Sequence, residues 1–102
     1  MKTDINFKGI ELSIELVDHV YKRLQAVEAL LKEDPRNRFI KAEFTIDKTS
    51  ADYTVKFDLK THKHTLLMSR HGIDIKEELD YVIDVMYQLL EKAEAESKRK
   101  VS

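Results

Sequence analysis

Three histidines in the middle of the chain have the residue type and spacing that could bind a metal ion. His62 and His64 stand two residues apart, so on one strand both imidazoles would point to the same face. A third ligand would have to come from His71 or Asp58. A structural zinc site normally has four clear ligands, and the chain has no cysteine. We therefore predict surface histidines in a turn, and no metal or other cofactor.

Two carboxylates, Asp80 and Asp84, stand four residues apart and would share one face of a helix. Such a pair could act as general acid and base, but more often it is solvated or binds a neighbouring loop. The chain lacks a cysteine nucleophile, a G-x-S-x-G elbow and a glycine-rich phosphate loop. The sequence therefore predicts a protein that is not an enzyme.

Basic side chains could instead bind a polyanion. The 102 residues include 18 Lys and Arg against 19 Asp and Glu, a net charge of -1, which excludes a strongly basic domain. Any such contact needs an uneven distribution of charge. Lys41, Lys56 and Lys60 would form a basic strip, diluted by Glu43 and Asp58, if they share the outward face of a sheet. The alternative is a solvated face that keeps the sheet soluble.

The first half of the chain predicts a strand followed by a helix. Residues 4–8 alternate polar and apolar side chains, which is typical of a strand, and Gly9 ends it. Ser13 is a candidate N-cap for an amphipathic helix with apolar residues at spacings of three and four. Pro35 stops this helix, and residues 34–38 form a loop.

Three further strands are predicted over residues 40–46, 53–60 and 64–69, each from its alternation. In the last of them Leu66 and Met68 share the buried face, which leaves Leu67 outward.

A second helix follows, with Asp74 as N-cap and Glu77 completing a capping box. Tyr81 and Val85 widen its apolar stripe and are expected at the edge of the core. Beyond about Glu96 the polar tail is expected to fray.

The order of these elements predicts an α+β fold, a two-layer β-α-β-β-β-α sandwich. Its four-stranded mixed sheet has the first two strands parallel, and both helices pack on one face. Residues 1–96 are expected to form a single domain and residues 97–102 a frayed polar C-terminal tail. With no signal-peptide or membrane-length apolar run, we expect a cytoplasmic protein with no membrane partner.

Two stretches resemble the short ribosome hibernation-promoting factors, also called ribosome-associated inhibitor or sigma-54 modulation proteins. The stretch 20–28 reads VYKRLQAVE, similar to the family pattern V-x-x-[RK]-L-x-K-L-E. The stretch 69–84 is similar to S-x-x-x-x-D-M-Y-x-A-I-D-x-x-x-D/N, and Phe39 to Ile46 stands where the family has its second strand. The resemblance extends from about Ile5 to Lys92. The residues that match the second pattern are Ser69, Asp74, Leu79, Asp80 and Asp84.

The resemblance implies a translation regulator that binds the small (30S) ribosomal subunit near the decoding centre. Family members contact mainly the 16S rRNA backbone, occupy the path of mRNA and tRNA, and hold ribosomes idle under stress or in stationary phase. Neither DNA nor a membrane is implied as a partner, and a homodimer is left open. The rRNA-binding residues that we predict are Lys22, Arg23, Lys56, Lys60, Arg70, His71 and Lys92.

The chain departs from the family at several basic positions. Ala26, Val85 and Gln88 stand where the family has basic residues, and Lys76 replaces a tyrosine. These differences favour an alternative function, a small non-catalytic protein–protein interaction module that keeps the fold but binds RNA weakly. Acidic residues also crowd the end of the second helix, at Glu91, Glu94 and Glu96.

Overall fold

The computed structural model describes residues 5–34, 36 and 38–101, with side chains as far as Glu96. The predicted order of elements is confirmed. Along the chain the elements are β1 (Ile5–Gly9), α1 (Ile14–Lys32), β2 (Phe39–Lys48), β3 (Tyr53–Thr61), β4 (Thr65–Gly72) and α2 (Ile75–Val101). Asp4 and Pro35, which the sequence assigned to the first strand and to the end of the first helix, lie outside the described residues.

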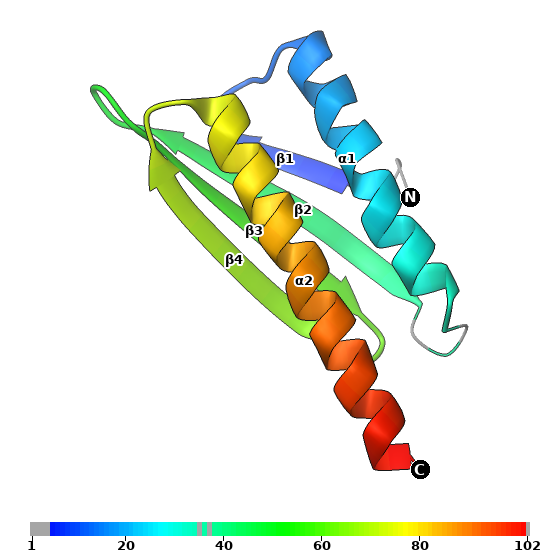
Figure 1. Cartoon of the computed structure of the whole chain (residues 1–102). Helices are drawn as coiled ribbons and strands as arrows, with labels where there is room; N and C mark the ends of the chain where they lie inside the picture. The colour runs from blue at the N-terminus through cyan, green and yellow to red at the C-terminus, as the bar shows by residue number, and fades with distance from the viewer. Residues whose placement is uncertain (1–4, 35, 37, 102) are drawn as a thin grey trace.

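The sheet has the strand order β1-β2-β3-β4 and is mixed, as predicted. β1 pairs with β2 in parallel, and β2, β3 and β4 form an antiparallel meander. Both helices cover the same face and begin at the same end of the sheet, and α2 continues past the sheet at its other end (Figure 1). The opposite face of the sheet carries no helix and stays open to solvent.

The core lies between the sheet and the two helices, because each strand places alternate apolar side chains on the covered face. Phe44 of β2 and Phe57 of β3 are fully buried, and their rings stack with centroids 4.2 Å apart. Phe7 of β1 stacks on Phe44 in turn. From the helices, Leu24 and Met86 are among the buried side chains that cover this centre. The open face therefore receives the polar half of each strand.

Both helix starts are capped by the predicted residues. Ser13 accepts a hydrogen bond from the backbone N–H of Leu16, and Asp74 accepts from the N–H groups of Lys76 and Glu77. The prediction that Glu77 completes the second capping box was wrong. The backbone N–H of Asp74 donates to Glu78, at 3.2 Å, because the buried Glu78 lies under β4, where it also binds Arg70.

Three other details differ from the predictions. The alternation over residues 40–46 places Ile40 on the same face as Ala42, Phe44 and Ile46, but Ile40 is 40% exposed and outside the core, because the register between β2 and β3 shifts between Phe39 and Lys41. Tyr81 is also 40% exposed, and Arg70 lies over its ring, 4.1 Å from the centroid. α2 continues to Val101, beyond the expected end near Glu96, and its last turns are rich in helix formers. That these turns fray stays a prediction.

Gly9 joins β1 to the segment that leads to α1 and adopts φ = 95°, a conformation that glycine reaches without strain. A side chain at this position would overlap the backbone carbonyl of Ile46 on the neighbouring strand. At Gly72 a side chain would meet only the carboxylate of Glu78, the far end of a flexible side chain. The two glycines therefore have different reasons to be glycine.

We predict that Gly9→Ala lowers the free energy of unfolding by at least about 2 kcal/mol, because it combines backbone strain with overlap against backbone atoms. Gly72→Ala is the comparison and should cost less, since it displaces the side chain of Glu78 and its bonds to Arg70 and Asp74 but overlaps none of the backbone atoms nearest to it. Urea unfolding followed by circular dichroism measures both. A Gly9→Ala protein as stable as the Gly72→Ala protein would contradict the strained conformation.

Candidate nucleic-acid interface

The seven predicted contact residues do not form one surface. Lys22 and Arg23 lie on α1 and Lys92 lies on α2, in the helix layer. Lys56 and Lys60 lie on β3 with their side chains on the open face, the face opposite to the buried Val55, Phe57 and Leu59. The remaining two are both on β4, but Arg70 lies on the covered face and His71 on the open face. The structure thus separates them into two groups on opposite sides.

Arg23 is engaged within the molecule. Its guanidinium forms ion pairs with Asp80 and Asp84 of α2, and His19 of α1 contacts Asp80 at 2.6 Å. Asp80 and Asp84 therefore serve as the bridge between the two helices, which is the structural alternative to acid–base catalysis. The predicted RNA contact at Arg23 must compete with two carboxylates.

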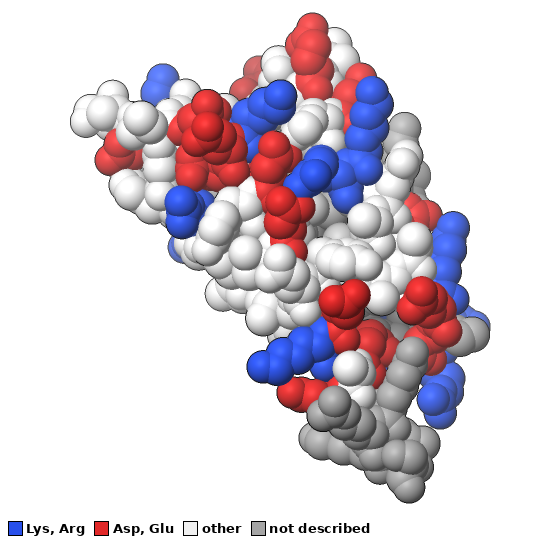
Figure 2. All heavy atoms as spheres, in the orientation of Figure 1, with Lys and Arg blue, Asp and Glu red and all other residues white. Residues whose placement is uncertain are grey.

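The helix layer has a slight excess of acidic residues. Over the full bounds of α1 and α2 the chain carries ten Asp and Glu against eight Lys and Arg, and three of these eight lie beyond Glu96. Figure 2 shows this side of the molecule, where acidic and basic side chains alternate among the described residues without a large basic area. A polyanion would therefore find no continuous basic surface among them.

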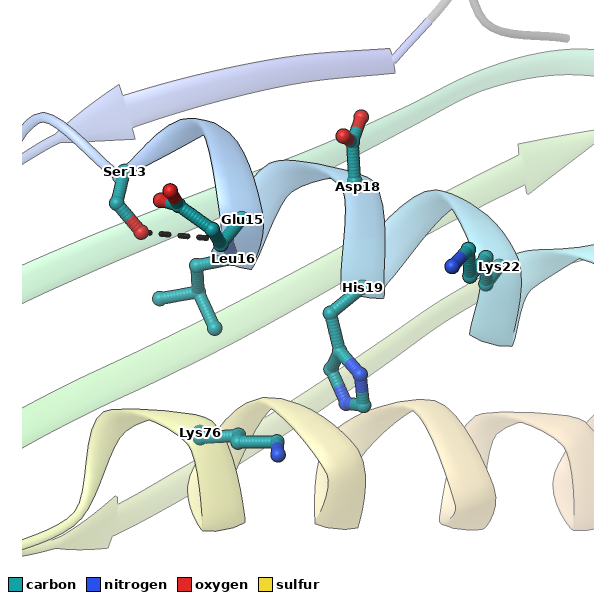
Figure 3. A pocket seen from close by; sticks show the side chains of 7 residues that line it. All are labelled: Ser13, Glu15, Leu16, Asp18, His19, Lys22 and Lys76. Atoms are coloured by element: carbon teal, nitrogen blue, oxygen red, sulfur yellow. Dashed lines mark hydrogen bonds between the residues drawn. The ribbon is translucent and has the colours of Figure 1, made fainter.

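A groove of about 520 Å³ opens between the first turns of the two helices, lined by Ser13, Glu15, Leu16, Asp18, His19, Lys22 and Lys76. In Figure 3 His19 points from α1 toward α2, whereas Asp18 points away from α2. The predicted contact Lys22 lies at this groove, in no ion pair with any residue that the structure describes. Its lining mixes the carboxylates Glu15 and Asp18 with Lys22 and Lys76, so the groove is not a purely basic site.

The two predicted contacts on β4 are also held by neighbours. Arg70 forms an ion pair with Glu78 at 3.2 Å and stacks on Tyr81. His71 contacts Asp52 and the hydroxyl of Thr54, each at 3.0 Å. Both side chains therefore contribute to local structure, whether or not they also contact a partner.

The open face does place Lys41, Lys56 and Lys60 together, as the alternation predicted. Lys41 lies directly opposite Lys60 across β2 and β3, and Glu43 lies opposite Asp58 in the next outward row. None of the three lysines forms an ion pair with another described residue, whereas Lys8 is paired with Glu43 at 3.4 Å. Like charges directly opposite each other destabilise a sheet by about 0.2–1 kcal/mol, so this arrangement favours an external anion.

A further group of basic residues, which the sequence reasoning did not assemble, lies at the end of the sheet where α1 ends. The backbone N–H of His62 donates to the carbonyl of Arg38 at 2.9 Å. This bond holds the β3–β4 turn against the segment that leads into β2. We call this group the basic corner, and it consists of Arg36, Arg38, Lys41, Lys60, His62 and Lys63. Its signal in the sequence is two short basic runs, at 36–41 and 60–63.

Asp34 fixes the geometry of the basic corner. Its carboxylate accepts a hydrogen bond from Lys63 at 2.6 Å and another from the backbone N–H of Arg36 at 3.0 Å. The hydrogen bond from Lys63, the bond from Arg36 and the charges of both residues lower the pKa of Asp34 to about 2, against the effect of burial. Asp34 therefore ties the end of α1 to the β3–β4 turn.

The histidines do not support a shared metal site. His62 and His64 lie in the turn between β3 and β4 rather than on a strand, and His64 is engaged by Glu94 at 3.2 Å. His71 lies toward the other end of β4, opposite Thr54. Over the described part of the chain, no three His, Cys, Asp or Glu side chains come together as metal ligands would.

Within the described residues, the structure contains no helix with the length and apolar character needed to cross a membrane.

Comparison with known proteins supports the fold. Neither a protein-family model nor the sequence of a curated protein matches the chain. The N-terminal domain of Protein Y from Thermus thermophilus superposes with a TM-score of 0.70 at 12% identity, over 85% of this chain and 93% of that domain. A ribosomal subunit interface protein from Coxiella burnetii gives 0.70 at 16% identity, over 89% of this chain and 97% of its own.

The chain has the fold of these two proteins. Both neighbours belong to the hibernation-promoting factor family that the sequence resembles. The α+β architecture implied by that resemblance is therefore confirmed, with its four-stranded sheet and two helices on one face. At such low identity the likeness concerns the backbone and assigns no contact residue.

We predict that Asp34 makes the free energy of unfolding depend on pH in the acidic range. Its low pKa in the folded protein means that its contribution is complete above about pH 4, the range of an ordinary carboxyl, and is lost as the pH falls toward 2. Asp34→Asn should be less stable at pH 7 and should lose less stability between pH 4 and 2. Urea unfolding at a series of pH values measures this.

Asp47→Asn is the matched control, because Asp47 is exposed and forms no ion pair with another described residue. Its stability should follow that of the wild-type protein over the whole pH range. An Asp34→Asn protein that declines in parallel with the wild type below pH 4 would contradict the role given to Asp34.

Proposed function

We propose that the chain binds the small ribosomal subunit near the decoding centre, through the backbone of 16S rRNA, and blocks the sites of mRNA and tRNA. Ribosomes would then be held idle under stress or in stationary phase. The observation that carries this proposal is the match in fold, over 89% of the chain, to a ribosomal subunit interface protein. The motifs at 20–28 and 69–84 support it independently.

Steric occlusion needs a rigid body and a binding surface, but no chemistry at the site. The two-layer sandwich supplies the rigid body, because its helices and strands share one core. Binding to rRNA backbone is driven by the release of condensed counterions when basic side chains approach phosphates. Such binding reads the shape of the RNA more than its sequence. No catalytic group, metal or cofactor is required, and the protein would act in the cytoplasm, where ribosomes are.

The open face of the sheet is the better of the two surfaces for this contact. Lys56 and Lys60 are exposed there, and no described carboxylate pairs with them. The three predicted contacts Arg23, Arg70 and His71 are already bound to carboxylates. Lys22 and Lys92 stay predictions, on a layer where acidic residues are in excess. We therefore assign the main rRNA contact to Lys56 and Lys60.

The alternative function, a protein–protein interaction module that binds RNA weakly, is favoured by a structural observation as well as by the lost basic positions. Leu67 on the edge strand β4 is 61% exposed on the open face, beside the polar rows of β3. Exposed apolar side chains of this size are found at protein interfaces as well as singly on ordinary surfaces. A partner bound there, including a second copy of the chain, would cover the lysines that the ribosomal proposal uses.

We predict that the wild-type protein sediments with purified 30S subunits in a sucrose gradient, and that this association weakens steeply as the salt concentration rises. Lys56→Glu with Lys60→Glu should abolish co-sedimentation at moderate salt. The matched control is Lys22→Glu with Lys92→Glu, which reverses the same number of charges on the helix layer. It should retain most of the binding.

The outcomes separate the proposals. Wild-type protein that stays at the top of the gradient at low salt would overturn the ribosomal function and favour the interaction module. Binding that survives in the β3 variant and is lost in the helix-layer variant would move the contact to the helices. Arg23 is left unchanged in both variants because its loss would leave Asp80 and Asp84 without their shared partner.

A further inference from the structure

The basic corner points to a second contact with RNA, separate from Lys56 and from every residue predicted on the helices. We infer that Arg36, Arg38, Lys41 and their neighbours bind the phosphate backbone of an RNA duplex that also lies on the open face. This inference rests on the proposed function for the identity of the RNA, but not for the chemistry of the site. The corner and the open face share Lys60, so one duplex can contact both.

Two segments far apart in the sequence converge to form the basic corner. The backbone bond from His62 to Arg38 measures 2.9 Å, and the adjoining residues Phe39 and Thr61 pair across the strands. The register shift after Phe39 then sets Lys41 directly opposite Lys60. Basic side chains from residues 36–41 and 60–63 thus occupy one end of the sheet, where the α1–β2 connection and the β3–β4 turn both lie (Figure 1).

Most of this positive charge is available to a ligand. The side chain of Arg36 is 72% exposed, although its guanidinium lies 3.6 Å from Asp34. Arg38 and Lys41 are exposed and in no ion pair with any residue described in the structure. Four carboxylates stand near the group in the sequence or in the register of the strands. Asp34 is bound to Lys63 and Glu43 to Lys8, whereas Glu33 follows α1 and Asp58 lines a hollow beside Lys41 and Lys60. The five Lys and Arg of the corner outnumber these four carboxylates, two of which are already paired.

The corner is also held in place before any ligand arrives. Asp34 binds Lys63 and the backbone of Arg36. In the turn, the N–H of Thr61 donates to the carbonyl of His64 at 2.8 Å. A surface that is already ordered loses less conformational entropy when it binds. The arrangement therefore favours binding of a rigid polyanion over weak binding of small anions from the salt.

The shape of the surface favours RNA over an acidic protein. The hollow on the open face, about 290 Å³, is lined by Lys41, Asp58, Leu59, Lys60 and Thr65. Its one large apolar residue, Leu59, is only 1% exposed, so this hollow offers no apolar surface to the anchor side chains that protein interfaces use. Regularly spaced phosphates need only basic side chains at the surface.

The test uses the full chain and a fluorescein-labelled RNA duplex of about 16 base pairs, long enough to span two minor grooves. Fluorescence anisotropy gives the dissociation constant over a series of salt concentrations. Arg38→Glu with Lys41→Glu should weaken binding at least about tenfold at low salt. It should also lower the slope of log affinity against log salt by about 2, or about 1 for each basic residue lost. Neither substitution removes a hydrogen bond or ion pair between described residues.

The control variant, Lys48→Glu with Lys76→Glu, changes the net charge by the same amount at exposed positions outside the corner and outside the predicted contacts. It should bind within about threefold of wild type, with the wild-type slope. Equal losses in both variants would overturn the site, because binding would then follow net charge alone. Tighter binding to polyglutamate than to the duplex would overturn the choice of RNA.

If the wild type binds the duplex through the corner but not 30S subunits, the site stands and the ribosomal function falls. If 30S binding persists in the Arg38 and Lys41 variant with unchanged salt dependence, the site falls and the function stands.

Discussion

The apolar face of the sheet must be kept from water, and α1 and α2 do this by lying side by side over the strands. Their burial of Phe44, Phe57 and the neighbouring side chains determines which side chains of the sheet face solvent. Because a strand alternates its side chains, residues that are not buried under the helices must point the other way. The outward position of Lys41, Lys56 and Lys60 on the open face is thus a direct result of the packing beneath them.

Charge is distributed unevenly between the two layers. The helices hold an excess of carboxylates, and several of these are used inside the molecule, where Asp80 and Asp84 bind Arg23 and Glu78 binds Arg70. The lysines of the open face and the basic corner have fewer such partners. A net charge near zero therefore conceals a difference in how the charges are used, because the basic side chains of the open face form fewer ion pairs among the described residues than those of the helices.

Local patterns predicted most of the fold, because they are read from neighbouring residues. The alternation in β2 and β3, the caps at Ser13 and Asp74 and the outward position of Leu67 all needed only the adjacent sequence. The bulge at Ile40 could not be predicted, because it depends on how β2 pairs with a strand more than ten residues later. Glu78 replaced Glu77 at the cap for the same kind of reason, since β4 holds it in place.

The candidate site was harder to predict than the fold, because its residues are distant in the sequence. Arg23 and Asp84 are 61 positions apart, so nothing near Arg23 indicates that its charge is already used. Arg38 meets His62 only through a backbone hydrogen bond between two loops. The basic runs were visible in the sequence, but their convergence is a property of the tertiary structure.

The parallel pairing of β1 with β2 has a consequence for how the chain folds. β1 precedes the other strands in the chain, yet its partner residues run from Ala42 to Ile46, beyond the whole of α1. Its pairing therefore closes a long segment, whereas each strand of the meander pairs with the one before it across a short turn. Until β1 has paired, the edge that it covers on β2 stays open to other chains.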